Sequence, residues 1–126
     1  MDGVRENMNK AIEEICKEFN ITYVEIINVV DFRKWTCGKI EELPYKGLYL
    51  NLLGDENKIR NLIGMFETDT EPQTWKQGKL TLLVFKKQMN LVCMFYITEK
   101  KGVESLEYSK SIFLRYSKIG NAPYLE

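Results

Sequence analysis

Two apolar runs that stand close together constrain this chain more than any other feature. The stretch LTLLVFKKQMNLVCMFYI, residues 80–97, joins them through KKQMN. Neither run alternates polar with apolar residues, as a strand with one solvated face does. The link is too short for a parallel crossover, so the two runs are predicted to pair as an antiparallel hairpin.

Both faces of this hairpin are expected to be apolar, because successive residues of a strand point to opposite sides. In the first run Leu80, Leu82 and Val84 oppose Leu83 and Phe85, and in the second Leu91, Cys93, Phe95 and Ile97 oppose Val92, Met94 and Tyr96. Both faces must therefore be covered, by helices of the same chain or by a second copy of it.

Three segments carry the apolar spacing of amphipathic helices. They are residues 5–19, residues 55–66 behind the typical N-cap residue Asp55, and a helix capped by Ser105 that stops at Gly120. The two helices near the chain ends are expected to cover one face of the sheet, and the middle helix part of the other. The last helix is predicted to share one face among Leu106, Ser109, Ile112, Phe113, Tyr116 and Ile119.

The remaining strands are expected between these helices. TYVEIINVV, residues 22–30, is rich in β-branched and aromatic residues, and Asp31 leads into FRKWTCGKI as its returning strand. LYLNLLGD, residues 48–55, fits either a short edge strand or an early start of the second helix, and TWKQGK, residues 74–79, is a candidate third strand. The predicted fold class is α/β of the α+β type, with a central antiparallel sheet of about five strands flanked by helices on both faces.

Length and charge narrow the class of protein. The chain has 126 residues, 44% hydrophobic and 29% charged, which is typical of a single soluble domain over residues 1–126. No apolar run reaches the roughly 18 residues that span a bilayer, and MDGVRENMNK is not a signal peptide, so we expect a cytoplasmic protein that does not bind membranes. The 18 basic and 18 acidic residues cancel, which argues against nucleic acid as a partner. Residues 1–72 carry a net charge of −5, however, and residues 73–126 carry +5.

Residues suited to catalysis are scarce. The chain has no histidine, which excludes Ser-His-Asp and Cys-His machinery and the commonest metal ligand. Cys37, near Arg33, Lys34 and Lys39, is the one thiol with neighbours suited to stabilising a thiolate. We therefore expect no enzymatic activity and no cofactor or metal. Glu67, Asp69 and Glu71 are interpreted as a solvated acidic loop. Lys86 and Lys87 are interpreted as protecting a hairpin tip from edge pairing. Trp75 either covers the end of the core or is an aromatic anchor at an interface.

The order of elements resembles the Roadblock/LC7 family, whose profilin-like fold runs α-β-β-α-β-β-β-α in about this length. IEEICKEFNITYVEIINVVD, residues 12–31, is similar to the opening helix and first strand of that family, and KLTLLVFKKQMNLVCMFYI, residues 79–97, to its central strands. The family commonly has a glycine in the first hairpin turn, where this chain has DFRK. Longin, GAF-like and PAS-like modules share much of this order of elements.

The resemblance implies a non-enzymatic module that forms a homodimer, with the middle helices side by side and the adjoining strands extending one sheet across both subunits. It also implies a role as a scaffold or regulator of a small Ras-like GTPase. The interface candidates on this interpretation are Ile59, Leu62, Ile63, Phe66 and Trp75. A charged residue in place of Ile63 or Phe66 is expected to split the dimer.

Two other classes of protein remain as hypotheses. An immunity protein or inhibitor would bind one toxin or nuclease through Tyr45, Tyr49 and the ETDTE loop. A GAF-like or PAS-like sensor would bind a small ligand in a pocket between its sheet and a helix.

Overall fold

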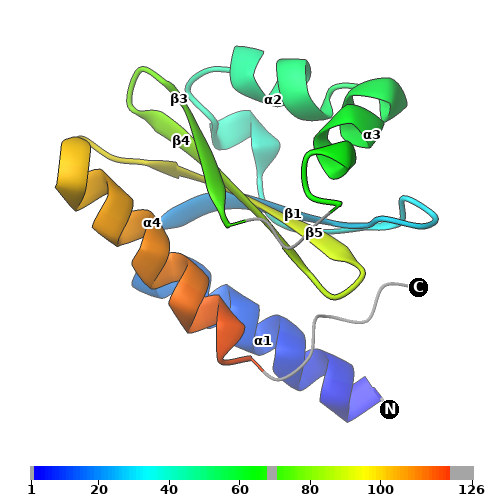
Figure 1. Cartoon of the computed structure of the whole chain (residues 1–126). Coiled ribbons are helices and arrows are strands. Elements are labelled where there is room, and N and C mark those ends of the chain that lie inside the picture. Colours follow the sequence, from blue (N-terminus) through cyan, green and yellow to red (C-terminus); the bar gives the residue numbers. More distant parts are fainter. Residues whose placement is uncertain (1, 68–70, 120–126) are drawn as a thin grey trace.

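A five-stranded antiparallel sheet lies between two layers of helices (Figure 1). The computed structural model describes residues 2–67 and 71–119, with side chains from residue 9 onward. The strand order across the sheet is β2-β1-β5-β4-β3. The elements are α1 (Asp2–Glu18), β1 (Ile21–Asn28), β2 (Lys34–Gly38), a short 3-10 helix η1 (Ile40–Glu42), α2 (Gly47–Leu53), α3 (Glu56–Gly64), β3 (Gln73–Gln77), β4 (Leu80–Lys87), β5 (Asn90–Ile97) and α4 (Gly102–Ser117).

Strands β4 and β5 confirm the predicted hairpin with two buried faces. They pair antiparallel in a register that places Leu82 opposite Phe95 and Leu83 opposite Met94. The other predicted strands are also present. Strand β1 pairs antiparallel with β2, and β3 pairs antiparallel with β4. The alternation of side chains thus divides each central strand between two apolar clusters, one on each face of the sheet.

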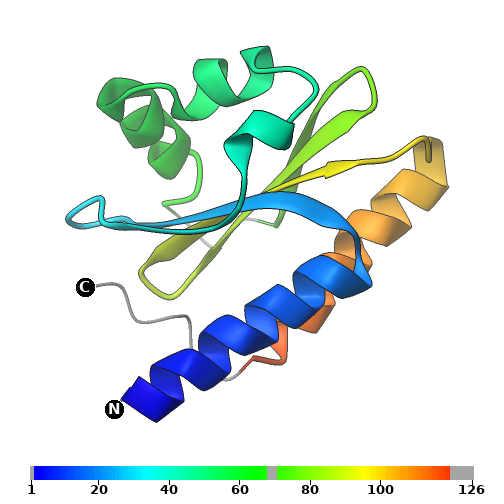
Figure 2. The same ribbon diagram turned by 180° about the vertical axis from the view of Figure 1, so that it is seen from behind.

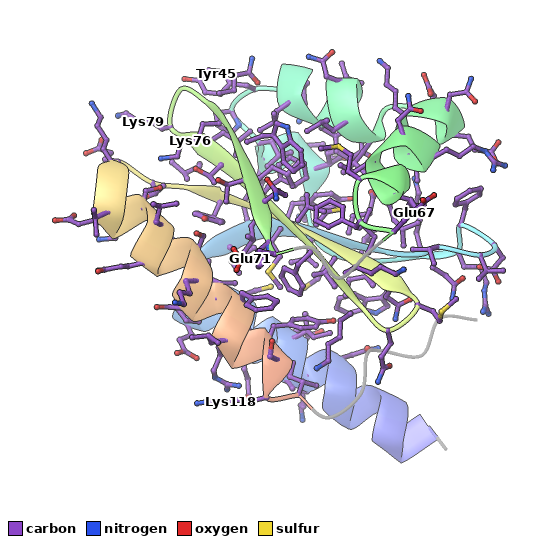
Figure 3. All side chains as sticks on the ribbon, in the orientation of Figure 1. Tyr45, Glu67, Glu71, Lys76, Lys79 and Lys118 are labelled. Carbon is purple, nitrogen blue, oxygen red and sulfur yellow. The ribbon has the colours of Figure 1, made fainter. Side chains whose placement is uncertain are left out.

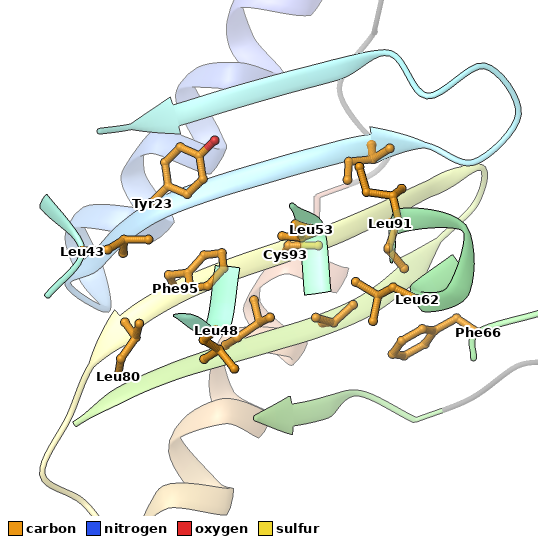
Figure 4. Packing of buried hydrophobic residues seen from close by; sticks show 14 residues of the cluster. Tyr23, Leu43, Leu48, Leu53, Leu62, Phe66, Leu80, Leu91, Cys93 and Phe95 are labelled. Carbon is orange, nitrogen blue, oxygen red and sulfur yellow. The ribbon is translucent and has the colours of Figure 1, made fainter. Parts of the chain in front are cut away.

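The two clusters are covered by different helices. Helices α1 and α4 lie together on one face and α2 and α3 on the other, an arrangement visible from both sides (Figures 1 and 2). The cluster under α1 and α4 includes Ile12, Ile15, Val24, Ile26, Leu83, Phe85, Val92, Met94, Tyr96, Ile112 and Tyr116. The cluster under α2 and α3, which we call the α2/α3 cluster, contains Tyr23, Ile27, Leu43, Leu48, Leu53, Ile59, Leu62, Phe66, Leu80, Leu82, Val84, Leu91, Cys93 and Phe95 (Figure 4).

The ambiguous segment 48–55 forms most of a separate helix, α2. Leu48 and Leu53 point into the α2/α3 cluster, and the backbone N–H of Leu48 donates to Oε1 of Gln77 at 3.0 Å. This bond gives one of the unpaired N–H groups at the start of α2 an acceptor on strand β3. Because α2 and α3 together bury this face, a second copy of the chain is not needed to cover it.

The helix boundaries agree only in part with the sequence pattern. Asp55 caps α3 as predicted, since its Oδ1 accepts the N–H of Lys58 at 2.9 Å. The predicted cap at Ser105 is wrong, because α4 begins at Gly102 and Ser105 is buried inside it. Leu106 is also not on the core face, since 65% of it is exposed. The buried face of α4 consists of Ser105, Ser109, Ile112 and Tyr116.

The hairpin tip is tighter than the sequence suggests. Strands β4 and β5 are joined by residues 88 and 89 alone, so Lys86 and Lys87 belong to β4. The ammonium group of Lys87 donates to the carbonyl oxygens of Tyr116, Ser117 and Ile119. Lys87 therefore caps the C-terminal end of α4, where unpaired carbonyls and the helix dipole favour a cation. Protection of the hairpin tip by Lys86 and Lys87 stays a prediction.

Candidate interaction surface

Strand β3 is one of the two edges of the sheet. It pairs with β4 on one side, and within the described part of the chain no strand pairs with its other side. Four of its five residues are exposed, and the fifth, Trp75, is half-buried. An edge strand presents a row of backbone N–H and C=O groups that can pair with another strand. This makes β3 a candidate surface for association.

The predicted interface residues divide between the core and this edge. Ile59, Leu62 and Phe66 are 4%, 1% and 0% exposed, and their side chains belong to the α2/α3 cluster. Leu62 and Phe66 lie over the part of the sheet formed by β4 and β3 (Figure 4). Ile63 and Trp75 are half-buried and pack against the rim of the same cluster. We call strand β3 together with Ile63 the β3 surface. An interface role for the five predicted residues, Ile59, Leu62, Ile63, Phe66 and Trp75, stays a prediction.

Two exposed apolar side chains of the α2 and α3 layer were not singled out by the sequence pattern. Met65, at the end of α3, and Leu50, on α2, are each 53% exposed. Both lie on helices whose opposite sides are buried in the α2/α3 cluster. Both lie between the buried positions of an amphipathic pattern, and residues at such positions face solvent. This spacing could have identified them as exposed apolar side chains.

A buried carboxylate anchors α2 to strand β1. Glu25 is 1% exposed, and its Oε1 accepts the hydroxyl hydrogens of Tyr23 at 2.8 Å and Tyr49 at 3.1 Å. The ammonium group of Lys34 lies 3.6 Å from its Oε2. Burial, and then the charge of Glu25, raises the pKa of Tyr49 to about 12. Tyr49 therefore stays a neutral donor near pH 7, and this network holds α2 in place.

The thiols do not have the lowered pKa that a nucleophilic cysteine needs. Burial, followed by the charge of Glu13, raises the pKa of Cys37. Burial and interaction with the neighbouring Cys37 thiol raise the pKa of Cys16 to about 12. The basic residues near Cys37 in the sequence thus do not make it a thiolate near pH 7.

We expect iodoacetamide to modify Cys16 and Cys37 in the folded chain at pH 8 at least about tenfold more slowly than in the urea-unfolded chain, because only the thiolate reacts. In the unfolded chain the modification rate should level off above pH 9, the ordinary thiol pKa, whereas in the folded chain it should keep rising beyond pH 9, for Cys16 towards its raised pKa of about 12. Mass spectrometry of timed samples measures both rates. Fast modification of Cys37 alone at pH 7 would contradict this expectation and reopen the question of a reactive thiol.

The remaining predicted features concern a metal site, a pocket between the sheet and a helix, and a membrane span. Asp69 of the acidic loop lies outside the described residues, and within the described ranges no three acidic or thiol side chains are placed to hold a metal ion. The surface pockets at the β3–β4 turn, beside Pro72 and along α4 are lined by residues outside the α2/α3 cluster. In residues 2–67 and 71–119, no helix has the length and apolar character required to cross a membrane.

The residues suggested for an inhibitor surface differ in exposure, and this surface stays a prediction. Tyr45 is 41% exposed, whereas the hydroxyl of Tyr49 is engaged with Glu25 inside the fold. The ETDTE loop includes residues 68–70, outside the described ranges. Tyr45 is therefore the more exposed of the two tyrosines, and Tyr49 is half-buried.

Comparison with known proteins bears on the fold. No protein-family model matches the sequence, and no curated protein matches it. Among solved structures, the chain is similar to Myxococcus xanthus MglB, with 13% sequence identity, a TM-score of 0.58, and 90% of each chain covered. This likeness, with the order of elements and the helices on both faces of the sheet, shows a Roadblock-like, profilin-like fold.

Proposed function

We propose that this chain with a Roadblock-like fold is a protein-interaction module that forms a homodimer and acts in the cytoplasm as a scaffold or regulator of a small Ras-like GTPase. The observation that carries the proposal is the outer edge of β3, which contains the half-buried Trp75 and pairs with no strand among the described residues. The class of partner comes from the Roadblock/LC7 resemblance, since members of that family serve small GTPases in these ways.

Pairing of two β3 strands fits the chemistry of this edge. A two-fold axis brings two identical strands together antiparallel, so that each residue of one copy meets its counterpart across the axis. A register centred on Trp75 places Lys76 of each copy opposite Thr74 of the other, which avoids direct opposition of like charges. The two Trp75 rings would then lie at the centre of the interface, where aromatic anchors contribute most to affinity.

The proposal gives the chain itself no catalytic step. The sequence has no histidine to serve as a general base, and burial raises the pKa of Cys37. A scaffold acts through a surface that binds other proteins. The β3 surface, together with the exposed apolar side chains of α2 and α3, supplies such a surface. A GTPase would be bound by the dimer as a whole or by one subunit.

We expect light scattering to give a mass of twice 14.8 kDa over a hundredfold range of protein concentration. Trp75→Asp and Ile63→Asp should each lower the mass towards that of one chain, because they place charges in the apolar part of the interface. Val30→Asp is the matched control, since Val30 is 70% exposed and follows β1, far from β3 in the strand order. A single-chain mass for the unmodified protein at every concentration would refute the homodimer.

Regulation of a GTPase is tested separately from dimerisation. Small Ras-like GTPases from the same organism, each loaded with GDP or with a non-hydrolysable GTP analogue, are titrated against the unmodified chain. Binding of one GTPase that depends on its nucleotide would support the proposed role. Equal absence of binding across the set would leave a dimeric module without this partner and refute that part of the proposal.

A further inference from the structure

Four lysines surround a cleft at one corner of the molecule. The cleft has a volume of about 520 Å³ and lies where the β3–β4 turn meets the segment joining β5 to α4. Lys76, on β3, and Lys79, in the β3–β4 turn, approach the cleft from one side, and Lys100 and Lys101 from the segment that joins β5 to α4. Lys76 and Lys79 lie at the same corner, with Tyr45 beside the turn (Figure 3). Segments distant in sequence thus present their positive charges to one space.

The charges that line the cleft are mostly uncompensated. Among the described residues, Glu99 is the one acidic side chain in the lining, and its Oε1 lies 2.8 Å from the ammonium group of Lys79. Within the described residues, no carboxylate forms an ion pair with Lys76, Lys100 or Lys101. The ammonium group of Lys76 makes only a long 3.4 Å contact to the carbonyl oxygen of Lys100. The lining therefore has four positive charges and one negative charge.

The start of α4 adds to this positive character. Lys101 is the N-cap residue of this 16-residue helix, and its side chain cannot accept a hydrogen bond from the first-turn N–H groups. The positive end of the helix dipole thus lies beside the lysines, and the carboxylate of Glu104 in the first turn of α4 offsets part of it. The uneven charge of the sequence has a structural counterpart here, because all four lysines belong to the half with a net charge of +5.

We propose that this cleft binds a ligand that carries two or more phosphate groups. Lysine binds phosphate as a point charge without a fixed bidentate geometry, so lysines on two sides of an open cleft suit several phosphates better than one planar carboxylate. The Lys79–Glu99 contact shows that an anionic oxygen can reach this ammonium group. The site does not depend on a homodimer, because three of the four lysines lie outside strand β3.

The experiment titrates the full chain with inositol hexakisphosphate and, separately, with vesicles that do or do not contain phosphatidylinositol bisphosphate. Calorimetry should detect binding that weakens as salt is raised, as expected for exposed charges. The double variant Lys100→Glu/Lys101→Glu should bind at least about tenfold more weakly, because charge-assisted contacts are lost. Glu99→Gln should bind more tightly, because it removes the one negative charge from the lining.

The matched control is Lys110→Glu/Lys118→Glu, which changes the net charge equally at exposed positions outside the cleft. Circular dichroism confirms that each variant is folded. Binding of the soluble phosphate alone assigns a free ligand to the cleft, and binding only to the phosphoinositide vesicles assigns a lipid headgroup. Equal weakening in the control would show unspecific attraction and overturn the proposal, as would absence of binding to both probes.

Discussion

Phe66→Asp should unfold the chain rather than split a dimer. Phe66 is fully buried in the α2/α3 cluster, beside Leu62 and over strands β4 and β3 (Figure 4). Truncating a buried phenylalanine typically costs about 3–5 kcal/mol, and a carboxylate placed in the same apolar site adds a desolvation cost. Since domains are typically stable by only about 5–15 kcal/mol, the sum removes most of the stability.

Ile63→Asp is the comparison that separates the core from the surface. Ile63 lies on the same helix but is only half-buried, so the new carboxylate can reach water. Far-UV circular dichroism and urea titration should therefore show a folded Ile63→Asp chain and an unfolded or strongly destabilised Phe66→Asp chain. A stably folded Phe66→Asp chain of halved mass would instead place Phe66 at the interface, as the sequence pattern suggested.

Gly38→Ala should destabilise the fold by about 2 kcal/mol or more. Gly38 ends strand β2 with φ of +88°, and a Cβ added there would lie 2.2 Å from the carbonyl oxygen of Thr22. A residue with a Cβ pays about 1–2 kcal/mol for a left-handed conformation, and the clash with backbone atoms adds strain that no rotamer relieves. The loss should appear at the β1–β2 edge, where Gly38 pairs with Tyr23.

Gly64→Ala is the matched control for this substitution. Gly64 is the last residue of α3, and no heavy atom lies within 4 Å of an added Cβ. Alanine in a helix is favoured over glycine by about 0.5–1 kcal/mol, so this variant should be unchanged or slightly more stable. Urea denaturation of both variants measures the contrast. Equal stability of the two would contradict the backbone geometry described for Gly38.

The two-sided sheet was predictable because side-chain direction in a strand follows from position alone. Leu82 and Leu83 had to face opposite sides once the segment was identified as a strand, and the structure places them in separate clusters. The cap at Ser105 failed for a different reason. Serine is a favoured cap, yet a small polar residue is also tolerated on a buried helix face, and at Ser109 of the same face the hydroxyl donates to the carbonyl oxygen of Leu106.

The interface could not be located from the sequence because an apolar stripe does not reveal what covers it. Ile59, Leu62 and Phe66 follow helical spacing, which predicts burial equally well against a sheet of the same chain or against another chain. The structure shows the sheet of the same chain beneath them. The lysine cleft was hidden for another reason, since Lys76 and Lys100 become neighbours only when β3 and the end of β5 are brought to one corner.

The separation of the core by a single sheet affects how this sequence can change over generations. Leu82 and Leu83 are adjacent in the chain but pack in different surroundings, whereas Leu83 and Ile112 share one cluster despite their distance in sequence. Substitutions that share no neighbours tend to act independently, while those in contact influence each other. Compensating substitutions should therefore arise between α4 and the face of β4 that α4 covers. Substitutions in the cluster on one face of the sheet should have little effect on the cluster on the other face.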